Sequence, residues 1–212
     1  MFLSHDSITN IHFLGDSLTA GYGVPAGKDW ITLLSHRIPG LTCYNHGACG
    51  AFLQDIIDAI PLFLDNRNNN TSVFIMGGTN DILSGRKLSD LEKQMEQAII
   101  KLSVSSHCFI GIPPLMTKQS IFSGWQAEWV FDKNVEALKV YGNFLEDLCR
   151  QHHIPYINFS KAFPVEDAWY VDGVHPNEKG HLKLANAAEK AIKIYVQQKH
   201  RLRICLFFTD KR

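Results

Sequence analysis

The stretch ITNIHFLGDSL, residues 8–18, carries the first sign of the fold. Its first part, from Ile8 to Leu14, is rich in β-branched and aromatic residues and predicts a strand that ends at Gly15. Asp16 and Ser17 follow, and Gly-Asp-Ser is ordinary turn chemistry. The alternative is that Ser17 stands at a strand-to-helix turn, with its hydroxyl exposed and its own backbone N–H directed into a site.

A short strand followed by a longer helix recurs along the chain. Strands are predicted at residues 8–14, 41–45, 72–76, 108–112 and 155–159, and helices at residues 30–38, 52–65, 89–104, 130–152 and 177–197. Ser89 and Glu92 fit a capping box at the start of the third helix. The alternation indicates right-handed βαβ units and therefore a parallel sheet that is covered on both faces. The predicted fold class is α/β, a flavodoxin-like three-layer α/β/α sandwich with a five-stranded parallel sheet.

Length and charge limit the class of protein. The chain has 212 residues, and 21 Lys and Arg balance 21 Asp and Glu. One domain is expected at this length, over residues 1–198. A C-terminal extension over residues 199–212 could pair at a sheet edge, form a homodimer contact or be disordered. The balanced charge argues against a nucleic-acid partner, and no apolar run is long enough to span a membrane.

The cysteines and the chain start favour a cytoplasmic location. The five cysteines are odd in number, widely spaced and without a CxxC pair, so they predict reduced thiols rather than a disulfide framework or a zinc site. His5 and Asp6 interrupt the stretch where a signal peptide would be apolar. The ten histidines form no cluster with ligand spacing, so no metal is expected.

Functional sites of parallel sheets lie beyond the carboxyl ends of the strands, so the segments after each strand carry the information. GGTND, residues 77–81, follows the third strand, and its Asn80 could cap a helix or direct an amide toward an oxyanion. DGVHPN, residues 172–177, precedes the last helix. Asp172 could hold the Nδ1–H of His175 and leave Nε2 free to accept a proton. The simpler interpretation is a solvated loop in which Asn177 caps the helix.

These segments, together with NHGACG at residues 45–50, resemble the GDSL esterase and lipase family, also called SGNH hydrolases. The four residues that name the family match Ser17, Gly50, Asn80 and His175, in the family's order, with Gly47 close to the second of them. There is no GxSxG motif, since Thr19 occupies the place of its final glycine, and this argues against the α/β-hydrolase pattern.

The resemblance implies a carboxylic ester hydrolase that acts on a small-molecule ester through an acyl-enzyme. Ser17 would be the nucleophile, His175 the base and then the acid, and Asp172 the acid that orients His175. The backbone N–H groups of Ser17 and Gly50, with the side-chain amide of Asn80, would form the oxyanion hole. No metal ion or cofactor is implied.

Other functions remain open from the sequence. The same residues could transfer an acyl group to an acceptor other than water, or remove acetyl groups from a carbohydrate. A catalytically silent binding module is a non-enzymatic alternative. A nucleotide-binding flavodoxin-like protein would share the sheet, but Pro25 interrupts the glycine-rich run from Gly21 to Gly27, which does not open directly off a strand.

Aromatic residues offer the one indication of the substrate. Trp125, Trp129 and Trp169 lie in segments that follow the predicted strands near the site. They could form an apolar wall for an acyl chain or a stacking surface for a sugar. They could equally pack beneath a long loop as a small satellite of the core.

Overall fold

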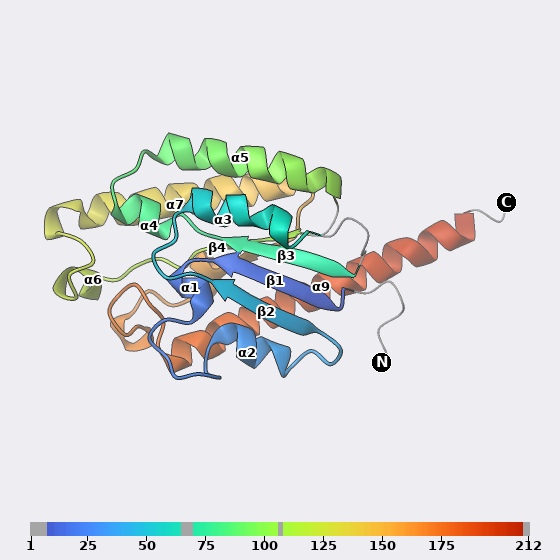
Figure 1. Cartoon of the computed structure of the whole chain (residues 1–212), viewed down its shortest axis with the longest axis horizontal. Helices are drawn as coiled ribbons and strands as arrows, with labels where there is room; N and C mark the ends of the chain where they lie inside the picture. Colours follow the sequence, from blue (N-terminus) through green and yellow to red (C-terminus); the bar gives the residue numbers. More distant parts are fainter. Residues whose placement is uncertain (1–7, 65–69, 106–107, 210–212) are drawn as a thin grey trace.

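The computed structural model describes residues 8–64, 70–105 and 108–209. Its centre is one parallel sheet with the strand order β2-β1-β3-β4-β5 (Figure 1). The strands are β1 (Asn10–Gly15), β2 (Thr42–Gly47), β3 (Thr71–Met76), β4 (Cys108–Ile112) and β5 (Tyr156–Asn158). The predicted five-stranded parallel sheet and its flavodoxin-like order are therefore confirmed. In this order the chain changes direction across the sheet between β1 and β3, where such folds bind their ligands.

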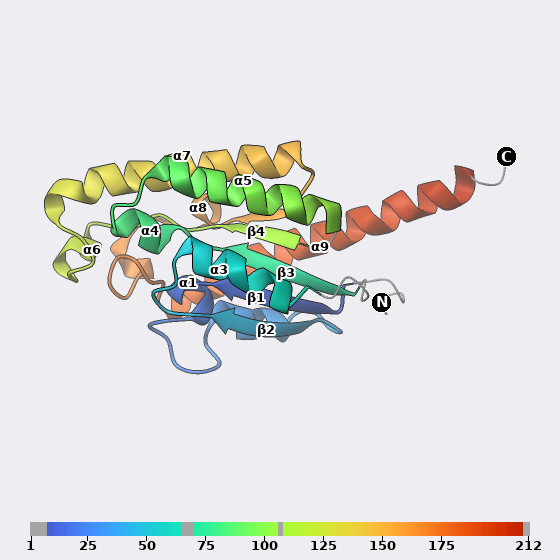
Figure 2. The ribbon, with the colours of Figure 1, turned by 45° about the horizontal axis from the view of Figure 1, so that its top comes forward.

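Helices cover both faces of the sheet, and Figures 1 and 2 show the same two layers from different sides. One layer contains α3 (Leu53–Ala59), α5 (Leu88–Ser105) and α7 (Glu128–Gln151), and the other contains α2 (Trp30–Ser35) and α9 (Glu178–Thr209). Shorter elements join them: α1 (Ser17–Ala20), η1 (Ile60–Leu62), α4 (Thr79–Leu83), α6 (Gln119–Phe122), α8 (Phe159–Ala162) and η2 (Asp167–Trp169).

The strands supply alternate residues to two cores. Val73 and Ile75 of β3 face the layer of α5 and α7, whereas Phe74 between them faces the layer of α2 and α9. All three side chains are fully buried. This two-residue period is what a strand with both faces covered requires, and it explains why β3 is apolar over most of its length.

Some helix boundaries differ from the sequence expectation. Ser89 does not cap α5, because the helix begins at Leu88 and the carbonyl of Lys87 accepts the first hydrogen bonds. The helix predicted over residues 52–65 ends at Ala59 and continues as the 3-10 turn η1, since Pro61 has no N–H to donate.

The last helix also departs from its predicted end near Gln197. It continues to Thr209, because neither Gly nor Pro occurs between residues 198 and 209. The side chains beyond residue 198 lie outside the described part, so the roles considered for residues 199–212 stay predictions. Among the described residues, no helix is both long and apolar enough to cross a membrane.

Candidate active site

Ser17 begins α1, directly beyond the carboxyl end of β1. The Asp16 carboxylate caps this short helix by accepting a hydrogen bond from the Leu18 N–H at 2.9 Å. Glycine is required at position 15, since a Cβ there would lie 2.0 Å from Oγ1 of Thr19. The turn thus holds Ser17 in place, and because Ser17 is the first residue of α1, its N–H has no partner within the helix.

Ser17, His175 and Asp172 form one chain of hydrogen bonds. Oγ of Ser17 lies 2.8 Å from Nε2 of His175, and Nδ1 of His175 lies 2.7 Å from Oδ2 of Asp172. Ser17 and His175 are almost completely buried. Residues 158 positions apart in the sequence therefore meet at the carboxyl end of the sheet, with the spacing that proton transfer requires.

Asp172 is held as a carboxylate. Burial alone would raise its pKa, but hydrogen bonds from the ring and backbone of His175 and from the Val174 N–H lower the pKa of Asp172 to about 2. The two backbone bonds to Oδ1 measure 2.8 and 3.0 Å. An ionised Asp172 keeps the ring proton of His175 on Nδ1, so Nε2 accepts the hydrogen bond that the Ser17 hydroxyl donates.

The loops after β2 and β3 meet beside this chain. Asn80, in α4, donates a hydrogen bond from Nδ2 to the carbonyl of Ala51 at 3.0 Å. Gly50 precedes Ala51, has a φ of +80° and faces open space, because a Cβ there would meet nothing within 4 Å. The predicted residues Gly50 and Asn80 are thus adjacent. One hydrogen of the Asn80 amide has no protein acceptor among the described residues.

The three tryptophans considered from the sequence lie in different surroundings. Trp125 contacts His175, with ring centroids 4.9 Å apart, and its Nε1 donates to Oδ2 of Asp172 at 2.8 Å. Trp129 is 87% exposed on α7. Trp169 is partly buried and packs against Phe163 in the core between the sheet and α9. Trp125 is therefore the tryptophan that the structure joins directly to His175 and Asp172.

Sequence reasoning missed Tyr22 and Asp81. The Tyr22 ring centroid lies 4.4 Å from that of the His175 ring, and Tyr22 is half-exposed. Tyr22 lies five residues after Ser17, in the loop that follows α1. This closeness in the sequence could have pointed to it. Asp81 is fully buried and accepts the backbone N–H of Leu53 at 2.9 Å. Its partner lies 28 residues away, so no local pattern pointed to it.

The site contains no cluster of metal ligands. Within residues 8–64, 70–105 and 108–209, no group of three or more His, Cys, Asp or Glu side chains is arranged to hold a metal ion. The side chains of Ser17, His175 and Asp172 instead bond to one another, an arrangement suited to acid–base chemistry.

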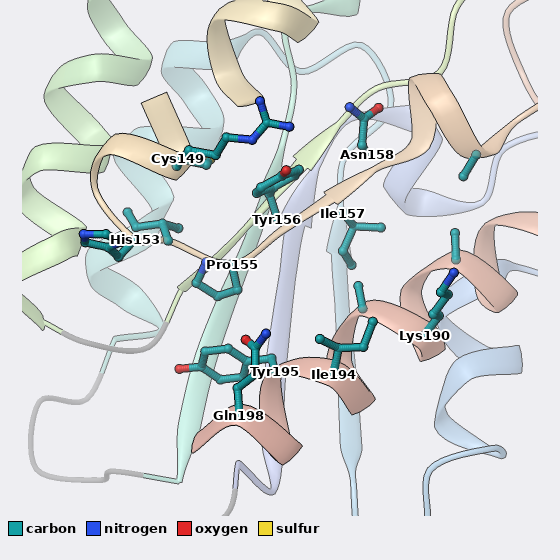
Figure 3. Close-up of a pocket in the computed structure, with 15 residues that line it drawn as sticks. Cys149, His153, Pro155, Tyr156, Ile157, Asn158, Lys190, Ile194, Tyr195 and Gln198 are labelled. Carbon is teal, nitrogen blue, oxygen red and sulfur yellow. The ribbon is translucent and has the colours of Figure 1, made fainter. Parts of the chain in front are cut away.

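A separate groove of about 1130 Å³ runs along the outer edge of β5 (Figure 3). Tyr156 and Asn158 of β5 line one side of it, and Lys190 and Ile194 of α9 line the other. It contains none of the predicted site residues. Its one thiol is that of Cys149, and burial raises the pKa of that thiol to about 12, so it is no nucleophile near neutral pH.

The sequence matches the profile of the GDSL-like lipase/acylhydrolase family over residues 13–183. A comparison with curated proteins gave no match. Among solved structures, a lipolytic protein of the G-D-S-L family from Veillonella parvula is 25% identical, with a TM-score of 0.71, and the alignment covers 85% of this chain and 96% of that one.

Two further structures share the fold at lower identity. Axe2, an acetylxylan esterase from Geobacillus stearothermophilus, is 18% identical, with a TM-score of 0.67 and coverage of 88% of this chain and 94% of that one. TesA is also 18% identical, with a TM-score of 0.67, and the alignment covers 87% of this chain and 98% of that one. The predicted three-layer architecture is thus found in solved structures of nearly the same extent.

Proposed function

The chain belongs to the GDSL-like lipase/acylhydrolase family, whose reaction is carboxylic ester hydrolysis, and we propose that Ser17, His175 and Asp172 are the triad that performs it here. One observation carries the proposal: the hydrogen bonds of 2.8 and 2.7 Å that run from Ser17 through His175 to Asp172. A turn or a helix cap would account for each residue singly but gives no reason for all three to meet.

The geometry supports a two-step reaction. Nε2 of His175 takes the proton of Ser17 as Oγ attacks the ester carbonyl carbon, and the same proton then passes to the leaving alkoxide. The alcohol departs and an acyl-serine remains. Water attacks the acyl-serine, gives a proton to His175, and releases the carboxylic acid as Oγ recovers that proton. Asp172 stays ionised throughout and stabilises the imidazolium.

The oxyanion would lie between three donors. They are the backbone N–H of Ser17, the backbone N–H of Gly50 and the second hydrogen of the Asn80 amide. The hydrogen bond from Asn80 to the Ala51 carbonyl fixes the amide beside Gly50 before substrate arrives. Donors that are already in place stabilise developing charge without reorganising, which is why they contribute strongly to the rate.

The substrate we propose is a small, uncharged ester. The free cysteines among the described residues, Cys43, Cys49, Cys108 and Cys149, support the proposed cytoplasmic location.

A homodimer through residues 199–212 is a further proposal, and truncation after Gln198 followed by a solution mass measurement tests it. If the truncated chain keeps the oligomeric state of the full chain, a dimer through residues 199–212 is contradicted.

The test of the reaction is hydrolysis of p-nitrophenyl acetate by the wild type and by Ser17→Ala. The variant is expected to lose at least about 10³-fold in kcat, since the acyl-enzyme forms on the Ser17 hydroxyl. Ser103→Ala, exposed on α5, is the control and should keep full activity. Full activity of Ser17→Ala overturns the mechanism. A series of acyl-chain lengths, with and without an alcohol acceptor, then defines the substrate and separates hydrolysis from acyl transfer.

A further inference from the structure

Oδ2 of Asp172 accepts two hydrogen bonds, and only one of them comes from His175. The indole Nε1–H of Trp125 donates the other at 2.8 Å, almost the same length as the 2.7 Å bond from Nδ1 of His175. The Trp125 ring also contacts the His175 ring edge to face. One side chain therefore touches both members of the acid–base pair.

The backbone that carries Trp125 is held by a buried polar network. The backbone N–H of Trp125 bonds to the Ser120 carbonyl at 3.0 Å. The neighbouring Gln126 donates to Oγ of Ser120 at 2.8 Å and accepts from Asn134 of α7 at 2.9 Å. Ser120, Gln126 and Asn134 are all buried. A side chain that only contacts substrate does not need such support, whereas one that holds a carboxylate in a fixed orientation does.

The segment before Trp125 is bonded to the Asp172 loop at three more places. The Tyr170 hydroxyl donates to the Leu115 carbonyl at 2.6 Å, and the Thr117 N–H donates to the Gly173 carbonyl at 2.9 Å. Nε2 of Gln119 donates to the Val171 carbonyl at 3.2 Å. The contact is close, because a Cβ on Gly173, whose φ is +83°, would lie 2.1 Å from the Ser120 nitrogen.

We propose that Trp125 is a positioning residue of the reaction, which uses its indole N–H to fix the Asp172 carboxylate and through it the ring of His175. The proposal rests on the proposed triad and goes beyond it. Asp172 sits on a loop, and its two backbone bonds both go to Oδ1. Trp125 supplies the second anchor for Oδ2, so that this oxygen does not turn away from His175.

The alternative is that Trp125 serves only as a wall for the acyl group. Trp125 is 39% exposed, so a substrate can reach it. The two roles differ in what they change. A wall affects KM, by an amount that grows with acyl-chain length. A positioning residue affects kcat by the same factor for every ester and leaves KM nearly unchanged.

Trp125→Phe would remove one of the two hydrogen bonds that Oδ2 of Asp172 accepts. The carboxylate can then turn about its side-chain bond, while its Oδ1 stays bonded to the backbone. The hydrogen bond from Nδ1–H of His175 to Oδ2 becomes longer, and the ring is held less well against Ser17.

The first variant is Trp125→Phe, which keeps an aromatic ring and removes the N–H. We expect kcat to fall about tenfold for acetyl and hexanoyl p-nitrophenyl esters alike, with KM nearly unchanged, since a bond to a charged acceptor is worth about that factor or more. Phe122→Leu, an 87% exposed side chain at the end of α6, is the control and should change neither quantity.

The second comparison is a double-mutant cycle with Asp172→Asn. In that background Trp125→Phe should have little further effect on kcat, because the charged acceptor is gone. Equal factors in both backgrounds, or a loss confined to KM of the longer ester, overturn the proposal. The proton NMR signal of Nδ1–H of His175 gives a readout that needs no turnover, because its chemical shift follows the strength of the hydrogen bond to Oδ2 of Asp172. The signal should move upfield in Trp125→Phe, and an unmoved signal contradicts the proposal.

These readouts separate the two proposals. If Ser17→Ala keeps the esterase activity, the triad is wrong, whatever Trp125 does. If Ser17→Ala is inactive and Trp125→Phe leaves both kcat and the Nδ1–H signal of His175 unchanged, the triad stands and the positioning role is wrong. Circular dichroism of each variant shows whether it is folded, and the Nδ1–H signal of His175 decides for any folded variant.

Discussion

The buried carboxylate of Asp81 accepts the backbone N–H of Leu53 at 2.9 Å. Its other oxygen accepts a hydrogen bond from Arg86 at 3.2 Å, and the Arg86 guanidinium lies 3.8 Å from the centre of the Phe52 ring. One acidic side chain thus ties the loop after β2, which carries Gly50, to the start of α4, which carries Asn80. The two proposed oxyanion donors depend on this connection for their spacing.

Asp81→Ala should therefore reduce both stability and activity. Removal of the carboxylate leaves the buried Leu53 N–H without its acceptor, and we expect a loss of about 1–3 kcal/mol in the free energy of unfolding, measured with urea. The kcat for p-nitrophenyl acetate should also fall. Asp58→Ala, on the exposed side of α3, is the control. A similar loss in both variants would show that the position of Asp81 has no special role.

Gly50→Ala tests the oxyanion loop against a matched glycine. Gly50 and Gly85 have φ values of +80° and +74°, and a Cβ on either would meet nothing within 4 Å. Both substitutions should therefore cost a similar backbone strain, about 1–2 kcal/mol in urea unfolding. Only Gly50→Ala should lower kcat: alanine keeps the backbone N–H, but the strain turns this peptide and its proposed donor away from the oxyanion, whereas Gly85 carries no proposed donor. Equal kcat values in the two variants would remove Gly50 from the oxyanion hole.

Asn80→Ala removes the proposed side-chain donor. We expect kcat to fall by about 10²–10³ with a smaller change in KM, since the amide acts on charge that develops in the transition state. Asn80→Asp should be at least as damaging, because a carboxylate repels an oxyanion. Asn143→Ala, exposed on α7, serves as the control in the same ester assay. Retention of most of the activity in Asn80→Ala would exclude this role.

The sequence predicted what repeats along the chain. The apolar run in β3 and the order of the segments after the strands were enough for the sheet, its parallel topology and the end at which Ser17, Asn80 and His175 lie. Both signals are local, because a strand buried on two faces must be apolar and its carboxyl end must lead into a loop. The sequence did not predict the short helices α1, α4, α6 and α8, since four or five residues show no helical period.

What could not be predicted depends on contacts between distant segments. The Trp125 bond to Asp172 joins residues 47 positions apart, and the segment offered only a cluster of aromatic residues. The sequence therefore suggested an apolar wall, a stacking surface for a sugar or a satellite of the core, where the structure has a hydrogen-bond donor. Ser89 illustrates the opposite error. Its sequence fits a capping box, but α5 begins one residue earlier, at Leu88, and the carbonyl of Lys87 accepts the first hydrogen bonds.

His181→Gln should reduce the acid sensitivity of the protein. His181 is fully buried in α9, and its Nδ1 accepts the Trp30 backbone N–H at 3.2 Å. Burial lowers the pKa of His181 from 6.5 to about 4, so between these values the unfolded chain binds more protons than the folded one. Stability is fully present above pH 6.5 and falls toward pH 4, by up to about 3 kcal/mol. Urea unfolding from pH 7 to pH 4 measures this loss.

The glutamine of this variant stays neutral over the whole range and still offers an acceptor, so the difference in unfolding free energy between the variant and the wild type isolates one histidine. His12 and His46, whose pKa values burial also lowers, contribute in the same direction in both proteins and cancel in that difference. Asp16, whose pKa burial raises to about 6, contributes in the opposite direction and cancels as well. His36→Gln, exposed at the end of α2, should leave the wild-type pH dependence intact. If His181→Gln loses stability on acidification as steeply as His36→Gln, His181 is not the buried group that destabilises the fold in acid.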